Sequence, residues 1–183
     1  MDRKLQKWQR LDRETLFDTK FLKVYQDTLK LPTGIIIDDY TVASLLSGVV
    51  IVATDSEGRL ITQLEYKYAI NEIILNLPSG SIEDGHSPLE TAAIELLEET
   101  GYESNEFELI KTVYEYPSKL DHKIHIVRAK NAVKVREVSH EVTESIGEVR
   151  LITSDMKKYQ GSFNTTYNIT ALALTLPEFL QNE

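Results

Sequence analysis

The chain has 183 residues, of which 42% are hydrophobic and 27% charged, with a formal net charge of −9 at pH 7 and no cysteine. This composition predicts one globular domain with a sizeable core, and it excludes disulfides and thiolate metal sites. The negative charge argues against a nucleic-acid partner, and no apolar run has the length of a membrane span. We therefore expect a soluble cytoplasmic protein that binds neither nucleic acid nor membrane.

The N-terminal quarter is expected to form β-strands. Residues 14–19 form a short candidate strand, and residues 21–30 and 34–43 flank the turn sequence Pro32-Thr33-Gly34, which favours a hairpin. No glycine- or serine-rich linker follows. We therefore interpret residues 1–45 as a hairpin extension of the same unit as residues 46–183.

The next segments predict the centre of a sheet. Residues 48–54 form a continuous apolar run, as in a strand that is buried on both faces. After a polar turn, residues 59–65 alternate as a returning strand, and the apolar residues 73–75 lead into Leu77-Pro78-Ser79-Gly80.

A helix is predicted over residues 88–100. Ser87 suits the N-cap, Pro88 the first helical position, and Glu90 can complete a capping box with Ser87. Gly101 is where the helix should end, because glycine adopts the left-handed conformation freely.

Three glutamates are expected on one side of this helix, opposite an apolar stripe of Leu89, Ala92, Ala93, Leu96 and Thr100. Glu95 and Glu99 are four residues apart, with Glu98 beside them, and such like-charge pairs cost a helix about 0.2–0.5 kcal/mol each. Either this is a solvated acidic face, or a hard cation such as Mg²⁺ bridges the carboxylates.

After the helix, further strands and two helices complete an α/β fold. The predicted strands are residues 107–115, 123–129 and 148–153, and the predicted helices are a short one at 155–159, capped by Ser154, and a longer one at 165–176. Together with the earlier segments, these predict an α/β/α sandwich around a mixed sheet.

From Gly80 to Tyr102 the sequence resembles the Nudix box, G-x5-E-x7-R-E-U-x-E-E-x-G-U, where U is apolar. The positions in register are Gly80, Glu95, Leu96, Glu98, Glu99 and Gly101. Two positions depart from the pattern: His86 stands where the box has its first glutamate, and Ile94 where it has arginine. The resemblance implies a Nudix-type fold with an N-terminal β-hairpin extension.

The order of short matches around the box is similar to the ADP-ribose pyrophosphatase branch, which includes nucleoside-diphosphate-sugar hydrolases. That resemblance implies Mg²⁺, with Mn²⁺ as a substitute, held by Glu95, Glu98, Glu99 and the Ser79 carbonyl. It also implies that Glu98 assists the base. The attacking water would be activated by an acidic residue of a later loop. Glu144 fits that role best through its Glu-x-Ile spacing and Glu141 is the alternate, while Val142 replaces a further acidic position.

The same resemblance implies candidate substrate contacts. Tyr66 and Lys67 stand where the branch has a Gln-Tyr-Arg segment, and Pro117 lies in a loop similar to its Ser-Pro-Gly-x-x-Asp-Glu loop, with His122 in place of the last residue. A solvated lysine and ordinary packing of the tyrosine remain the alternatives for the first two residues. The branch also implies a homodimer.

Two functions are consistent with these residues. The first is Mg²⁺-dependent hydrolysis of the pyrophosphate bond in a nucleoside diphosphate linked to a sugar, such as ADP-ribose, by an enzyme that uses the retained glutamates. The second is a Nudix-fold module that binds a nucleotide or nucleotide-sugar as a sensor or regulator, suggested by the uncharged side chains at Ile94 and Val142 and by His86 and His122.

Overall fold

The computed structural model describes residues 5–138, 145–152, 159 and 161–176. The chain divides into two compact units, each described here by itself. The N-terminal unit comprises Met1–Leu46 with Tyr114–His122, and the larger unit comprises Ser47–Val113 with Lys123–Glu183. The predicted short helix at 155–159 and its cap Ser154 lie, apart from Tyr159, outside the described residues.

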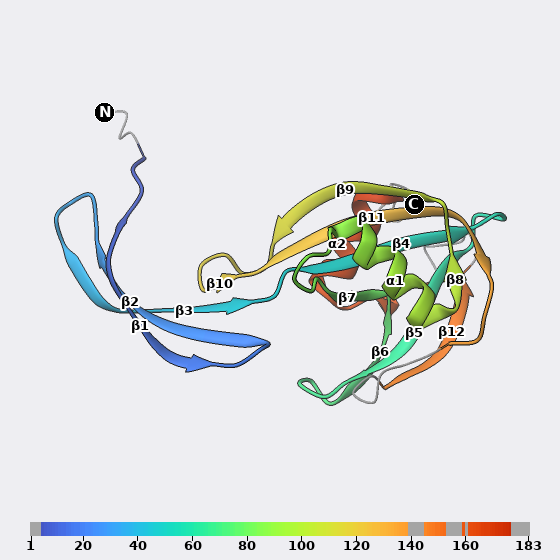
Figure 1. Cartoon of the computed structure of the whole chain (residues 1–183), viewed down its shortest axis with the longest axis horizontal. Coiled ribbons are helices and arrows are strands. Elements are labelled where there is room, and N and C mark those ends of the chain that lie inside the picture. Colours follow the sequence, from blue (N-terminus) through green and yellow to red (C-terminus); the bar gives the residue numbers. More distant parts are fainter. Residues whose placement is uncertain (1–4, 139–144, 153–158, 160, 177–183) are drawn as a thin grey trace. The chain divides into compact units, whose positions relative to one another are not determined.

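The N-terminal unit is a four-stranded sheet in the order β1-β2-β3-β10 (Figure 1). Its strands are β1 (Gln9–Asp18), β2 (Leu22–Lys30), β3 (Ile36–Leu45) and β10 (Leu120–Asp121). β2 and β3 form the predicted hairpin, whose turn is closed by the Gly34 N–H donating to the Leu31 carbonyl at 2.9 Å. β10, which comes from much later in the chain, pairs in parallel with β3.

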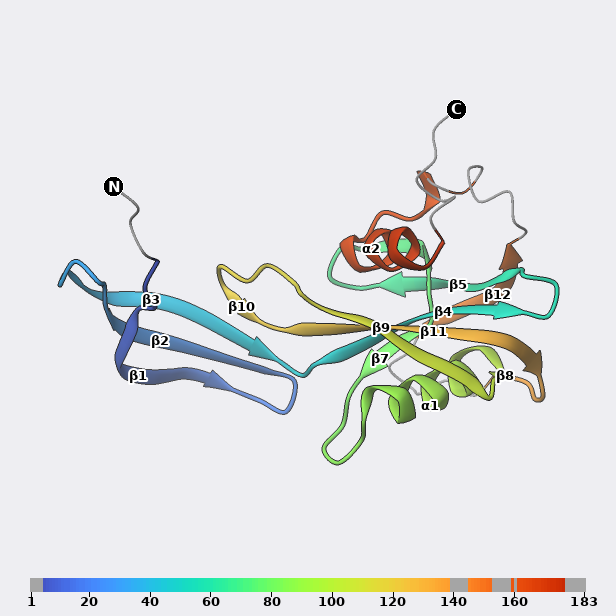
Figure 2. The same ribbon diagram turned by 90° about the horizontal axis from the view of Figure 1, so that it is seen from above.

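The larger unit is built on a mixed sheet in the order β12-β5-β4-β11-β8, with β6 on β5, β7 on β4 and β9 on β11. Its strands are β4 (Gly48–Asp55), β5 (Leu60–Lys67), β6 (Glu72–Asn76), β7 (Ser79–Ser81), β8 (Tyr102–Glu103), β9 (Glu106–Tyr114), β11 (Lys123–Lys134) and β12 (Ile146–Ile152). Helices α1 (Pro88–Thr100) and α2 (Thr166–Thr175) lie on opposite faces of this sheet (Figure 2). The predicted α/β class is confirmed. Within the described residues, neither helix is long and apolar enough to cross a membrane.

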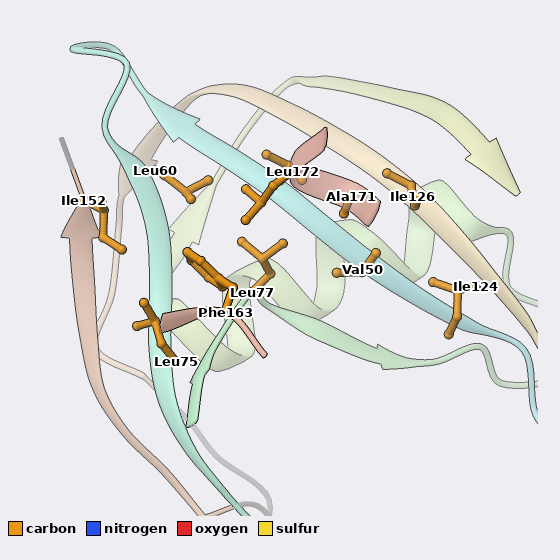
Figure 3. Close-up of a cluster of buried hydrophobic side chains, with 11 residues drawn as sticks. Val50, Leu60, Leu75, Leu77, Ile124, Ile126, Ile152, Phe163, Ala171 and Leu172 are labelled. Carbon is orange, nitrogen blue, oxygen red and sulfur yellow. The ribbon is translucent and has the colours of Figure 1, made fainter. Parts of the chain in front are cut away.

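The central strand β4 is apolar from Gly48 to Ala53 because both of its faces are covered there. On one face Val50 and Val52 join a cluster with Ala171 and Leu172 of α2 (Figure 3). On the other face Val49, Ile51 and Ala53 pack with α1. The two clusters hold the sheet between the helices. They also fix α1 against β4, the strand that pairs with β7.

Helix α1 has the predicted bounds and the predicted caps. The Ser87 hydroxyl accepts from the Glu90 N–H, the Glu90 carboxylate accepts from the Ser87 N–H at 2.8 Å, and Pro88 opens the first turn. The predicted faces are wrong at two residues: Glu99 is buried with Leu96 and Thr100, and Leu89 is exposed. Helix α1 is therefore amphipathic, but through Glu99 its buried face also presents a carboxylate to the protein interior.

Gly101 is expected to be irreplaceable for stability, because two effects coincide there. Its φ of 76° strains any other residue, and an added Cβ would overlap the Arg136 carbonyl oxygen. Gly85 has a similar φ of 93° but open space around it. We expect Gly85→Ala to cost about 1–2 kcal/mol of unfolding free energy and Gly101→Ala clearly more, as measured by urea denaturation. Equal losses in the two variants would contradict a role for the Arg136 contact.

Candidate active site

The centre of the candidate site is the contact between α1 and the short strand β7. The Ser79 N–H donates to Oε2 of Glu99 at 2.8 Å, so the helix carboxylate is fixed to the strand backbone. Glu95, one turn earlier, lies directly over Gly80, where a Cβ would overlap its carboxylate. Gly80 is therefore required for the close approach of a side chain and not for an unusual backbone angle. The strand and the helix together place two carboxylates side by side.

Glu99 has an unusual electrostatic environment, since only 2% of the residue is exposed. Burial raises the pKa of its carboxyl well above the usual range, and the nearby carboxylates of Glu95 and Glu65 raise it further. The Ser79 N–H and the amide of Gln63 stabilise the ionised form and offset part of that rise. A buried carboxyl among other carboxyls is poised to hold either a proton or a cation.

Glu65 belongs to a buried hydrogen-bonded network that the sequence did not reveal. Its Oε2 accepts from Asn76 Nδ2 at 2.6 Å, and its Oε1 pairs with the Lys67 ammonium. Asn168 of α2 donates to Asn76 Oδ1 at 2.9 Å and accepts from the Leu77 N–H. One signal in the sequence could have indicated this network. In β5, Ile61, Gln63 and Glu65 alternate along one face of the strand, so two polar side chains follow an apolar one on a face expected to be buried.

The structure brings together three of the predicted metal-binding residues, namely Ser79, Glu95 and Glu99. Glu98 is solvent-exposed. Glu141 and Glu144, the two candidates for activating water, lie outside the described residues, as does Val142.

The predicted substrate residues have local partners. The Tyr66 hydroxyl donates to Asn71 Oδ1 at 3.1 Å, and Lys67 pairs with Glu65 and is not simply solvated. Pro117 belongs to the N-terminal unit, where it lines a cavity of about 320 Å³ with Tyr40, Lys119 and Asp121 among other residues. These contacts leave the substrate roles as predictions.

The residues that depart from the box pattern lie at the surface. His86 and Ile94 are both exposed, so no buried charge is left without its partner by their substitution. In the N-terminal unit, His122 Nδ1 lies 3.2 Å from Glu115 Oε2. The departures therefore do not disturb the contact of Glu95 and Glu99 with β7.

The donor set fits a hard divalent cation, although a complete site is not formed by the described residues. No group of three or more acidic or histidine side chains at metal-binding distances occurs among them. Glu95 and Glu99 nevertheless lie together at β7, and the charge of Glu65, which pairs with Lys67, raises the pKa of Glu99. Oxygen ligands of this kind suit Mg²⁺ and Mn²⁺.

Comparison with known families agrees with this geometry. Residues 45–165, which include β7 and all of α1, match the NUDIX domain. The chain therefore belongs to the Nudix family. Residues 8–43 match the N-terminal domain of nucleoside diphosphate sugar hydrolases. The protein is thus a Nudix hydrolase of the nucleoside-diphosphate-sugar hydrolase type.

Individual relatives lie at modest identity. The chain is 28% identical over 132 residues to ADP-ribose pyrophosphatase of Bacillus subtilis (strain 168), covering 72% of this chain and 70% of the relative. It is 29% identical over 121 residues to the methanol dehydrogenase activator of Bacillus methanolicus, covering 66% and 65%. A crystal structure of an ADP compounds hydrolase superposes with a TM-score of 0.81 at 26% identity, covering 97% of this chain and 96% of that one.

Proposed function

We propose that the protein hydrolyses the pyrophosphate bond of a nucleoside diphosphate linked to a sugar, with ADP-ribose as the leading substrate. Water adds across the P–O–P bridge and gives a nucleoside monophosphate and a sugar phosphate. The observation that carries the proposal is the pair Glu95 and Glu99 packed on Ser79 and Gly80 within the matched Nudix region. The relatives named for ADP-ribose and ADP compounds support the substrate class.

A divalent cation would be held by Glu95, Glu99, Glu98 and the Ser79 carbonyl, and when bound it neutralises phosphate charge and acidifies a water molecule. The chain's own contribution is preorganisation. Hydrogen bonding to Ser79 fixes Glu99, and packing on Gly80 fixes Glu95, so neither carboxylate must be ordered when substrate binds. Burial of Glu99 in a poorly solvated region also strengthens its attraction for a cation.

The remaining site residues have proposed roles that follow from the resemblance. Glu144, with Glu141 as the alternate, would take the proton of the attacking water, and exposed Glu98 would assist. Lys67, held by Glu65, would bind a phosphate oxygen, and Tyr66 would contact the nucleoside. For Pro117, which belongs to the N-terminal unit, the substrate contact stays a prediction from the resemblance.

We also propose a homodimer. The N-terminal unit has many exposed apolar side chains, namely Trp8, Leu11, Leu16, Phe17, Phe21, Ile35 and Ile36. β1 is exposed along its whole length, and the described part of this unit contains strands only. A small sheet of this kind needs a cover for its apolar side chains, which a second copy would provide. Size-exclusion chromatography with light scattering would measure the mass directly.

Turnover of a substrate panel tests the proposed function. The panel contains ADP-ribose, GDP-mannose, UDP-glucose, a dinucleoside polyphosphate and a nucleoside triphosphate, each with Mg²⁺ and with EDTA. Products of the capped substrates are detected as phosphate released by added alkaline phosphatase, which cleaves phosphate monoesters and leaves an internal diphosphate bridge intact. Turnover of the nucleoside triphosphate, which the phosphatase itself attacks, is followed without it by chromatography of the nucleotide products. We expect Mg²⁺-dependent hydrolysis of at least one nucleoside diphosphate sugar, with ADP-ribose preferred.

The alternative is a binding module, and the same panel distinguishes it. One relative is named as an activator of another enzyme, which makes a regulatory role a specific alternative. No turnover of any panel member, together with ligand-induced thermal stabilisation, would replace the hydrolase by that module. Preferred turnover of the triphosphate would overturn the substrate class.

A further inference from the structure

Gln63 is a buried polar residue that the site described above does not yet use. It lies in β5 directly opposite Asn76 of β6, and its residue is 0% exposed. Among the described residues, neither Nε2 nor Oε1 has a hydrogen-bond partner of regular geometry. An amide in this position loses its bonds to water without full replacement, so its presence requires an explanation.

The surroundings of Gln63 indicate which group it serves. Asn76 is already engaged at both ends of its amide, by Glu65 and by Asn168. Ile61, two residues earlier and on the same face of β5, packs into the cluster that contains α1, so this face accepts a hydrocarbon side chain. The Gln63 amide is therefore on the side of β5 that faces α1, the helix that carries Glu99, and it is one of the groups that lower the pKa of the Glu99 carboxyl.

We propose that Gln63 is a positioning residue that orients the Glu99 carboxylate for a divalent cation, an inference that rests on the proposed function. The Ser79 N–H holds Oε2 from β7 at 2.8 Å. The Gln63 amide, unpartnered among the described residues, lies on the α1-facing side of β5, from which it would donate to the same carboxylate when a cation draws that carboxylate into place. With a cation bound, two donors on different strands would restrict rotation of the carboxylate, which a single hydrogen bond does not. Partners of this kind set the orientation of metal ligands.

The substitution Gln63→Met tests this role, because methionine has a similar length and no amide. Mn²⁺ binding to metal-free protein is measured by titration calorimetry, and thermal stability is measured without cation. We expect the Kd for Mn²⁺ to rise about 10-fold or more. The melting temperature without cation should stay unchanged or rise, because a buried amide lacking regular partners is removed. Gln63→Leu should behave in the same way. This second variant shows that the effect comes from loss of the amide and not from the methionine side chain itself.

Thr62→Val serves as the matched control. Thr62 is the next residue in β5, is equally buried, and points to the opposite face, where its hydroxyl donates to the Arg150 carbonyl at 3.0 Å. We expect it to lower the melting temperature and leave Mn²⁺ affinity unchanged.

Three results would overturn the proposal in distinguishable ways. If Gln63→Met binds Mn²⁺ as tightly as the parent, the Gln63 proposal fails and the metal site stands. If both Gln63 variants lose stability with unchanged affinity, Gln63 is a structural residue. If the parent itself binds no Mn²⁺, the metal-dependent function fails first and the Gln63 proposal fails with it.

Discussion

Replacing Glu99 with glutamine is expected to abolish metal-dependent turnover and at the same time stabilise the metal-free protein. Glutamine has the same shape, and its Oε1 can still accept the Ser79 N–H. It cannot supply the negative charge that a cation needs, so the loss of kcat/KM should exceed the about 10–100-fold that follows removal of an outer partner of a ligand. It also carries no charge into a site that is 2% exposed, so the burial penalty disappears.

The stability gain should depend on pH in a defined direction. Burial, with Glu95 and Glu65 nearby, raises the pKa of Glu99 in the folded protein above its unfolded value, so the folded state binds this proton more tightly. The parent therefore loses stability as the pH rises from the unfolded pKa through the raised folded one. Glutamine has no such loss, and the gap in melting temperature between variant and parent should widen over that range.

Differential scanning fluorimetry in EDTA, repeated with Mg²⁺, measures both effects. Mg²⁺ should raise the melting temperature of the parent and leave Glu99→Gln nearly unchanged. Glu103→Gln, which removes the same charge from an exposed position on β8, is the control and should show no comparable gap. A gap that does not vary with pH would mean that Glu99 is not the residue responsible, and full activity of the variant would refute its role as a ligand.

How far the sequence predicts this molecule depends on the distance over which each signal acts. The bounds of α1 follow from Ser87, Pro88, Glu90 and Gly101, which act within one turn, and the prediction is confirmed. The run 48–54 likewise predicts β4, because a strand covered on both faces must be apolar throughout. Local chemistry and burial periodicity therefore predict the main elements of the larger unit.

What the sequence could not predict depends on pairings between distant segments. The stretch 114–122 belongs to the N-terminal unit because β10 pairs in parallel with β3, 77 residues earlier (Leu120 with Ala43). Burial of Glu99 likewise requires β7 beside the helix, and no property of the helix alone distinguishes a buried glutamate from a solvated one. The position of Gln63 could not be predicted for the same reason, because it depends on the packing of α1 against β5.

Gly80→Ala is expected to disable the enzyme with little effect on the fold. A methyl group at this position would overlap the Glu95 carboxylate, which is the far end of a flexible side chain and can move away. The backbone of Gly80 has no positive φ, so alanine introduces no backbone strain there. The variant should therefore unfold within about 1 kcal/mol of the parent while its Glu95 carboxylate is displaced.

The size of the catalytic loss follows from the geometry of that displacement. A misplacement of about 1 Å in a reacting group can cost about 10²-fold in rate, so we expect kcat/KM to fall by at least that factor and Mn²⁺ affinity to fall with it. Gly161→Ala is the control, because it makes the same chemical change where a Cβ meets no atom of the described residues within 4 Å. It should retain full activity.

If Gly80→Ala is instead as active as the parent, Glu95 can reach its functional position from another rotamer, and the close packing on β7 is not what organises the site. If it fails to fold, Gly80 is a structural glycine, and the two roles are separated by measuring unfolding before activity.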